Sequence, residues 1–94
     1  MEKEQGVTAD DVARWMADQV TRVGVLDQAA TAERLVQAYG ATFAIKNGNG
    51  TWAIAKPVLA RFRKRTATTV VWNGSILAWR LRTPDDPPDR RQVG

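Results

Sequence analysis

The sequence of 94 residues predicts a single small α+β domain in which three helices are followed by a β-hairpin. Three observations indicate this fold class. Apolar residues recur at helical spacing in three segments, each with a recognisable start signal. Asn73-Gly74 lies between two runs rich in β-branched and aromatic residues, which is the strongest short hairpin signal. A hydrophobic fraction of 44%, with four Trp, suffices for one thin core at this length.

The first helix is predicted to begin after Thr8 and to end before Gly24. Thr8 and Asp11 have the spacing of a capping box, in which each side chain bonds the other residue's backbone N–H. Glycine is the residue that most often follows a helix, because it accepts a left-handed backbone. The apolar face of this helix consists of Val12, Trp15, Met16, Val20 and Val23.

A short strand and a second helix follow. Val25-Leu26 is predicted as the strand, and Asp27 as the N-cap of a helix over residues 28–39 that ends at Gly40. In residues 41–55, apolar and small residues alternate on both sides of Asn47-Gly48-Asn49-Gly50. This pattern is compatible with a weak hairpin or with an ordered loop, and we favour the loop.

The third helix is predicted over Lys56–Arg65. Pro57 suits a first helical turn, because its missing N–H has no intrahelical partner there. Val58, Leu59 and Phe62 fall on one stripe that faces the core. The opposite side is almost wholly cationic and carries Lys56, Arg61, Arg63 and Lys64, with Arg65 at the flank.

The hairpin is predicted from residues 68–72 and 76–82. With a two-residue turn, Trp72 lies opposite Ser75 and Val70 opposite Leu77. The buried face then holds Val70, Trp72, Leu77, Trp79 and Leu81, and the other face holds Thr69, Val71, Ile76, Ala78, Arg80 and Arg82. A longer, bulged loop would shift this register.

The element order is typical of a winged helix-turn-helix domain, with the hairpin as the wing and the third helix in the recognition position. Residues 41–55 are long for the turn before that helix. We expect residues 1–7 to be a flexible N-terminus, residues 8–83 to be the domain and residues 84–94 to be a mobile tail. The tail has three prolines and five charges, which cannot form a core.

Positive charge is concentrated in one part of the chain. The net charge is +4 and the isoelectric point is near 10.1. Residues 51–83 contain no acidic residue and seven basic ones: Lys56, Arg61, Arg63, Lys64, Arg65, Arg80 and Arg82. These residues lie on the third helix and the wing, so we expect them to bind double-stranded DNA, with Arg61 or Lys64 placed for base readout.

Two other interpretations of these features stay open. The chain would be a protein-interaction module, such as a homodimer paired through the hairpin, if the acidic first half neutralised the cations. Trp52, Trp72 and Trp79 would be stacking platforms for single-stranded bases if they were exposed, although core positions are favoured.

The composition argues against catalysis and against a membrane partner. Cys and His are absent, which excludes disulfides, thiolate metal sites and the commonest general base. No glycine-rich phosphate loop follows a strand. We therefore expect no enzyme activity, cofactor, metal or small-molecule substrate. The polar N-terminus and the lack of a long apolar run predict a cytoplasmic protein.

Four segments carry a resemblance to a known family: Ala9–Met16, Lys56–Lys64, the hairpin over residues 69–82 and the tail over residues 86–90. Together they resemble a family of small, uncharacterised bacterial proteins associated with integron and other mobile gene cassettes. The resemblance covers most of residues 9–91 and implies a winged-helix-like domain in a bacterial cytoplasm, with no established activity. The chain departs from that family at Ala55, where relatives carry a polar helix cap, and at Ile76-Leu77, which are more apolar and favour self-association.

Overall fold

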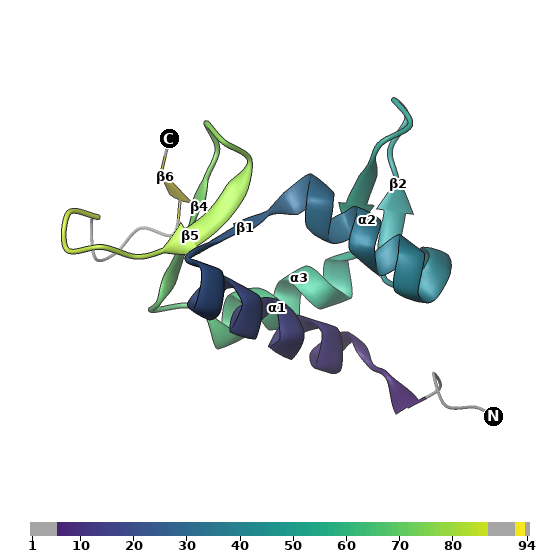
Figure 1. The fold of residues 1–94 in the computed structure, drawn as a ribbon, viewed down its shortest axis with the longest axis horizontal. Coiled ribbons are helices and arrows are strands. Elements are labelled where there is room, and N and C mark those ends of the chain that lie inside the picture. Colours follow the sequence, from purple (N-terminus) through teal and green to yellow (C-terminus); the bar gives the residue numbers. More distant parts are fainter. Residues whose placement is uncertain (1–5, 87–91, 94) are drawn as a thin grey trace.

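The computed structural model describes residues 6–86 and 92–93, and it is an α+β fold with three α-helices (Figure 1). The elements in chain order are α1 (Ala9–Val23), β1 (Val25–Asp27), α2 (Gln28–Tyr39), a single 3₁₀ turn (Gly40–Thr42), β2 (Ala44–Lys46), β3 (Trp52–Ile54), α3 (Lys56–Arg65), β4 (Val70–Asn73), β5 (Ala78–Leu81) and β6 (Gln92–Val93).

The helices begin and end at the residues that local signals predict. The Thr8 hydroxyl accepts a hydrogen bond from the Asp11 N–H at 3.1 Å, and the Asp11 carboxylate accepts one from the Thr8 N–H at 2.9 Å. Gly24 ends α1 with φ 95°, a conformation that side-chain-bearing residues adopt only with strain. Asp27 caps α2 by accepting from the Ala30 N–H at 2.9 Å. Each of these capping hydrogen bonds joins residues three positions apart, so the local sequence suffices to predict it.

The main sheet has the strand order β1-β5-β4-β6. β1 and β4 both pair antiparallel with β5, which confirms the short strand predicted after α1. β6 pairs parallel with β4, with Gln92 opposite Trp72. The prediction that the hairpin is the C-terminal element is therefore wrong, because Gln92–Val93 adds a further strand at the edge of β4.

The register of the β4–β5 hairpin also differs from the prediction. Val70 lies opposite Leu81 and Trp72 opposite Trp79, so residues 74–77 form a longer loop in place of a two-residue turn. The Asn73 side chain accepts from the Ser75 N–H at 2.9 Å, and Leu77 takes φ 53°. This loop geometry turns Leu77 outward, and its side chain is 59% exposed instead of buried.

The outer face of this hairpin, opposite the face that was predicted to be buried, is itself partly covered. Val71 and Ala78 lie on that face and are only 1% and 2% exposed. The chain after β5 turns back on this side, where the Asp86 carboxylate accepts hydrogen bonds from Arg80. Alternation within β4 and β5 was thus predicted correctly, and Val71 and Ala78 are buried on the outer face as well.

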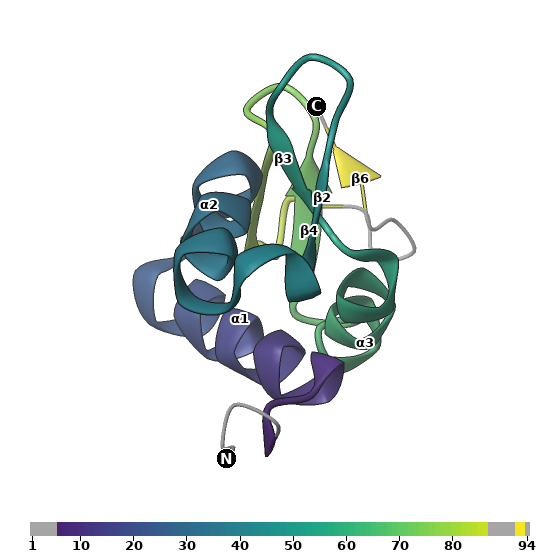
Figure 2. The same cartoon turned by 90° about the vertical axis from the view of Figure 1, so that its right-hand side faces the viewer.

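Residues 44–54 form a second hairpin, so the loop favoured for this segment is wrong. Ala44 lies opposite Ile54, and the Asn47 N–H donates to the Thr51 carbonyl at 2.7 Å. Ile54 is 2% exposed and belongs to the core. Both hairpin loops extend to the same end of the molecule, away from α1 and α3 (Figure 2).

The core lies where the helices meet the inner face of the main sheet. α1 packs against α3, and Phe62 of α3 is fully buried with its ring edge-to-face with Trp79, 5.0 Å between centroids. Trp79 is therefore a core residue, as favoured. Trp72 and Trp52 are half-buried. The expectations for residues 1–5, 87–91 and 94 fall outside the described residues.

Candidate nucleic-acid interface

α3 exposes a cationic surface because its apolar residues occupy only one side. Val58 and Phe62 are fully buried. At 100° per residue, Lys56, Arg61, Arg63 and Lys64 fall within about 160° of arc on the opposite side. All four side chains are exposed. Within the part of the chain that the structure describes, none of the four forms an ion pair. We call these residues the α3 cations.

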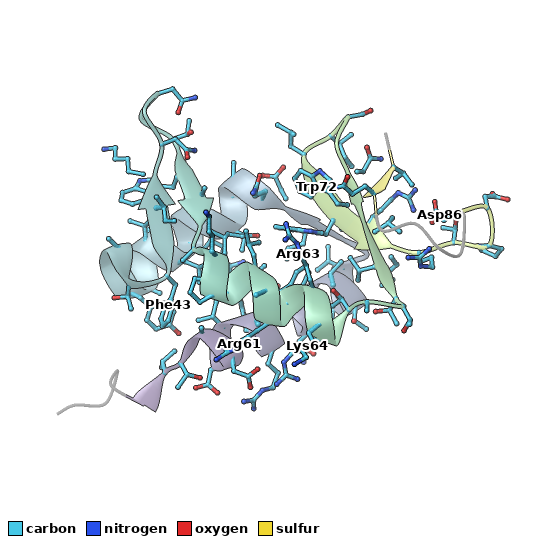
Figure 3. The ribbon with its side chains drawn as sticks, turned by 180° about the vertical axis from the view of Figure 1, so that it is seen from behind. Phe43, Arg61, Arg63, Lys64, Trp72 and Asp86 are labelled. Atoms are coloured by element: carbon cyan, nitrogen blue, oxygen red, sulfur yellow. The ribbon has the colours of Figure 1, made fainter. Side chains whose placement is uncertain are left out.

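The α3 cations lie on both flanks of the helix. Arg61 and Lys64 are on the side nearer α1, whereas Arg63 is on the side that faces Trp72 and the two hairpins (Figure 3). Between these flanks the helix presents Ala60, an exposed residue with a small side chain. The outward surface of α3 is therefore a narrow ridge with positive charge on each side.

Arg65 is held apart from the α3 cations by an acidic partner. Its Nη2 lies 2.8 Å from Oδ2 of Asp10, in the first turn of α1. The hydrogen bond from Arg65 lowers the pKa of the Asp10 carboxyl, and the charges of Arg65, Arg14 and Arg61 add to this effect. The positive charge of Arg65 is thus largely offset at the α1–α3 contact.

Arg80 is bound to a carboxylate on the far side of the sheet. Trp79 faces α3, so its neighbour Arg80 points to the outer face. There the two terminal nitrogens of Arg80 donate to the two Asp86 oxygens at 3.0 and 2.8 Å. The Thr83 N–H donates to the same carboxylate at 2.7 Å. These bonds hold the pKa of Asp86 well below its usual value and raise the pKa of Arg80.

The predicted wing adds no cation to the α3 surface. Arg82 is half-buried just after β5, and its backbone N–H donates to the Thr69 carbonyl at 2.8 Å. Strand alternation places it on the same side as Arg80. The β4–β5 loop, residues 74–77, carries no charged residue and exposes Ile76 and Leu77. The seven predicted site residues therefore do not form one continuous surface.

Asp10 and Asp86 were not predicted as the partners of Arg65 and Arg80. A loop was favoured for the segment that forms the β2–β3 hairpin just before α3. Thr83 and Asp86 have the same spacing as Thr8 and Asp11, which was a usable signal for a side-chain-to-backbone bond. The hairpin is joined to the start of α3, where the Ala55 N–H donates to the Phe43 carbonyl at 2.9 Å. It carries Lys46, whose ammonium lies 5.6 Å from the centroid of the Trp52 ring.

Nothing in the described ranges, 6–86 and 92–93, suggests a metal centre: no cluster of three or more acidic, His or Cys side chains could hold an ion there. Among the same residues, none of the helices combines the length and the apolar character needed to cross a bilayer.

A model of a family of unknown function, DUF6953, matches residues 8–81, so the chain belongs to that family. No curated protein and no solved structure matches the chain significantly.

Proposed function

We propose that this protein is a winged-helix-type module that binds double-stranded DNA through α3. The observation that carries the proposal is the set of four exposed α3 cations, which form no ion pair within the described residues. The order α1-β1-α2-α3-β4-β5 supports the winged-helix interpretation, with the β2–β3 hairpin inserted before α3. The association with integron cassettes stays a prediction from resemblance.

The dimensions and charge of α3 suit a major groove. A helix of ten residues is about 15 Å long, and the major groove is about 12 Å wide. With the ridge in the groove, Arg61 on one flank and Lys56 and Arg63 on the other would contact phosphates of opposite strands. Ala60 would allow close approach, and Lys64 would reach base edges.

This interface is smaller than the one the sequence predicts. Arg65 and Arg80 already bond Asp10 and Asp86, so each would give up a charge-assisted hydrogen bond to bind a phosphate. Arg82 lies with Arg80 on the outer side. The proposal therefore rests on the α3 cations alone.

The test compares two double variants with the same net charge in fluorescence-anisotropy titrations of a labelled 20-base-pair duplex. Arg61→Gln with Lys64→Gln removes two α3 cations, and Arg22→Gln with Arg34→Gln removes two cations from α1 and α2 as the control. At 0.1 M salt, we expect the α3 variant to lose about 50-fold in affinity. The control should lose much less. Equal losses in both variants, or no binding by the wild type, would exclude this function. Circular dichroism verifies that both variants fold.

A second candidate function, self-association through the β4–β5 loop, is favoured by its exposed apolar residues. Ile76 and Leu77 are 52% and 59% exposed at the tip of this hairpin. A dimer paired through this loop would bury both side chains. Light scattering on wild type and on Ile76→Glu tests this idea, which requires a dimeric mass that Ile76→Glu converts to the monomer. A monomer mass for both proteins excludes it.

A further inference from the structure

A cavity of about 490 Å³ lies between α3 and the inner face of the β4–β5 hairpin. Its apolar wall consists of Leu59, Phe62, Ala67, Val70, Trp72 and Trp79. Small-molecule sites in proteins have volumes of about 300–1,000 Å³ and are mostly apolar with a few polar groups. The cavity therefore has the size of a ligand site, and it combines an apolar wall with polar residues.

Three aromatic rings, inclined to one another, form much of the apolar wall of the cavity. The Trp72 and Trp79 rings, directly opposite each other in the ladder, have centroids 4.9 Å apart and planes inclined at 60°. The Phe62 ring meets Trp79 edge-on at 5.0 Å. Because Phe62 and Trp79 are buried while Trp72 is half-buried, Trp72 is the ring of this wall that a ligand can reach. Flat aromatic molecules pack favourably on such a ring.

The polar residues of the cavity favour a ligand that carries a negative charge. Arg63 is the cation of its lining, and no carboxylate lines it among the described residues. Figure 3 shows Arg63 on the side of α3 that faces Trp72. Gln28 and Gln92 also belong to the lining, whereas the Thr66 hydroxyl already donates to the Phe62 carbonyl at 2.8 Å. A guanidinium beside an apolar wall binds carboxylates, sulfonates and phosphates by charge-assisted hydrogen bonds.

We propose that this cavity binds a small organic anion that has a flat aromatic body and one acidic group. The body lies against Trp72, and the acidic group accepts hydrogen bonds from Arg63. The site stands independently of DNA binding, but the two share Arg63. An anion in the cavity would occupy one α3 cation and so weaken the binding of DNA phosphates.

The test uses two dyes that differ only in the acidic group. 1-Anilinonaphthalene-8-sulfonate carries a sulfonate, and N-phenyl-1-naphthylamine is the same body without it. The full chain is titrated with each dye while the indole N–H signals of its four Trp are followed by NMR. We expect the sulfonate dye to bind more tightly and to shift Trp72 and Trp79. Trp15 and Trp52, which do not line the cavity, serve as internal controls. Equal affinity for the two dyes, or shifts centred on Trp15 or Trp52, would contradict the proposal.

Three variants distinguish the contribution of the Arg63 charge to dye binding from that of the cavity volume. Arg63→Gln should weaken the sulfonate dye about tenfold and leave the uncharged dye nearly unchanged. Arg61→Gln, with the same charge change on the other flank of α3, should alter neither. Ala67→Leu keeps Arg63 but fills part of the cavity, and should weaken both dyes. If Arg63→Gln and Arg61→Gln behave alike, Arg63 does not hold the anion. The dye titrations need no DNA, so their failure and the failure of DNA binding are distinguishable.

Discussion

Arg65 of α3 and Asp10 of α1 form an ion pair at 2.8 Å, although 55 positions separate them in the sequence. This pair joins the last turn of α3 to the first turn of α1, where the two helices pack. Both side chains remain partly exposed, at 37% and 46%. Asp10 therefore offsets one positive charge of α3 next to the α3 cations.

The first prediction is that Asp10→Asn strengthens DNA binding. Removing this carboxylate releases Arg65 beside Arg61, which adds one possible phosphate contact, worth roughly fivefold in affinity at 0.1 M salt. Asp18→Asn is the control, since it makes the same charge change but removes a partner of Arg22 at the other end of α1. Anisotropy titrations measure both. Unchanged or weaker binding by Asp10→Asn would argue against contact between this end of α3 and DNA.

The second prediction concerns Asp86 and pH. The pKa of Asp86 is lower in the folded chain than its usual 3.8, mainly because Arg80 donates to it. Its ionised form therefore stabilises the fold above about pH 4, and this stabilisation is lost as the pH falls below that value. Asp86→Asn should lower the melting temperature at pH 7, and the difference from wild type should shrink at pH 3. Asp85→Asn, at the exposed neighbouring residue, is the control. The same difference at both pH values would show that the ion pair does not stabilise the fold.

The third prediction is that Leu77→Asn stabilises the protein. Leu77 has φ 53° and an exposed side chain, so it is strained and makes little apolar contact. Asn tolerates the left-handed conformation better, and the gain in unfolding free energy should be about 0.5–1 kcal/mol. Leu77→Val, whose branched side chain fits this conformation worse, should destabilise. Urea unfolding measures both variants. A loss of stability in Leu77→Asn would mean that Leu77 is held by a contact, such as a dimer interface.

The fourth prediction addresses the core beneath α3. Phe62 is fully buried against Trp79, so Phe62→Ala should cost about 3–5 kcal/mol of unfolding free energy. For a domain of this size, that loss is a large part of the total stability. Arg61→Ala, next to it on the exposed side, should cost less than about 0.5 kcal/mol. Similar costs for both variants, measured in urea, would contradict the orientation of α3.

The helices could be predicted from sequence because their signals are local. Thr8, Gly24 and Asp27 each form their capping bonds within four residues of their own position. The hairpin register could not be predicted, because Asn73-Gly74 suggests a two-residue turn while Asn73 in fact bonds Ser75 and Leu77 turns outward. β6 escaped prediction because its partner, β4, is about twenty residues earlier in the chain.

The sequence indicates which residues of α3 are exposed, but it does not indicate how the cations are arranged and paired in the folded chain. Helical periodicity alone places Lys56, Arg61, Arg63 and Lys64 on the exposed side of α3. Whether a cation is already engaged by a carboxylate depends on tertiary contacts, as Arg65 with Asp10 shows. The cavity beside Arg63 likewise arises only when α3 packs on the β4–β5 hairpin, so no local pattern indicated it.

The salt dependence of DNA affinity tests the central claim most directly. If Lys56, Arg61 and Arg63 each neutralise one phosphate while Lys64 reaches a base edge, the logarithm of the association constant should fall with the logarithm of salt concentration at a slope of about −2.7. In the Arg61→Gln with Lys64→Gln variant the slope should be about −1.8, whereas Arg22→Gln with Arg34→Gln should keep the wild-type value. A wild-type slope near zero, or equal slopes in all three proteins, would contradict the account.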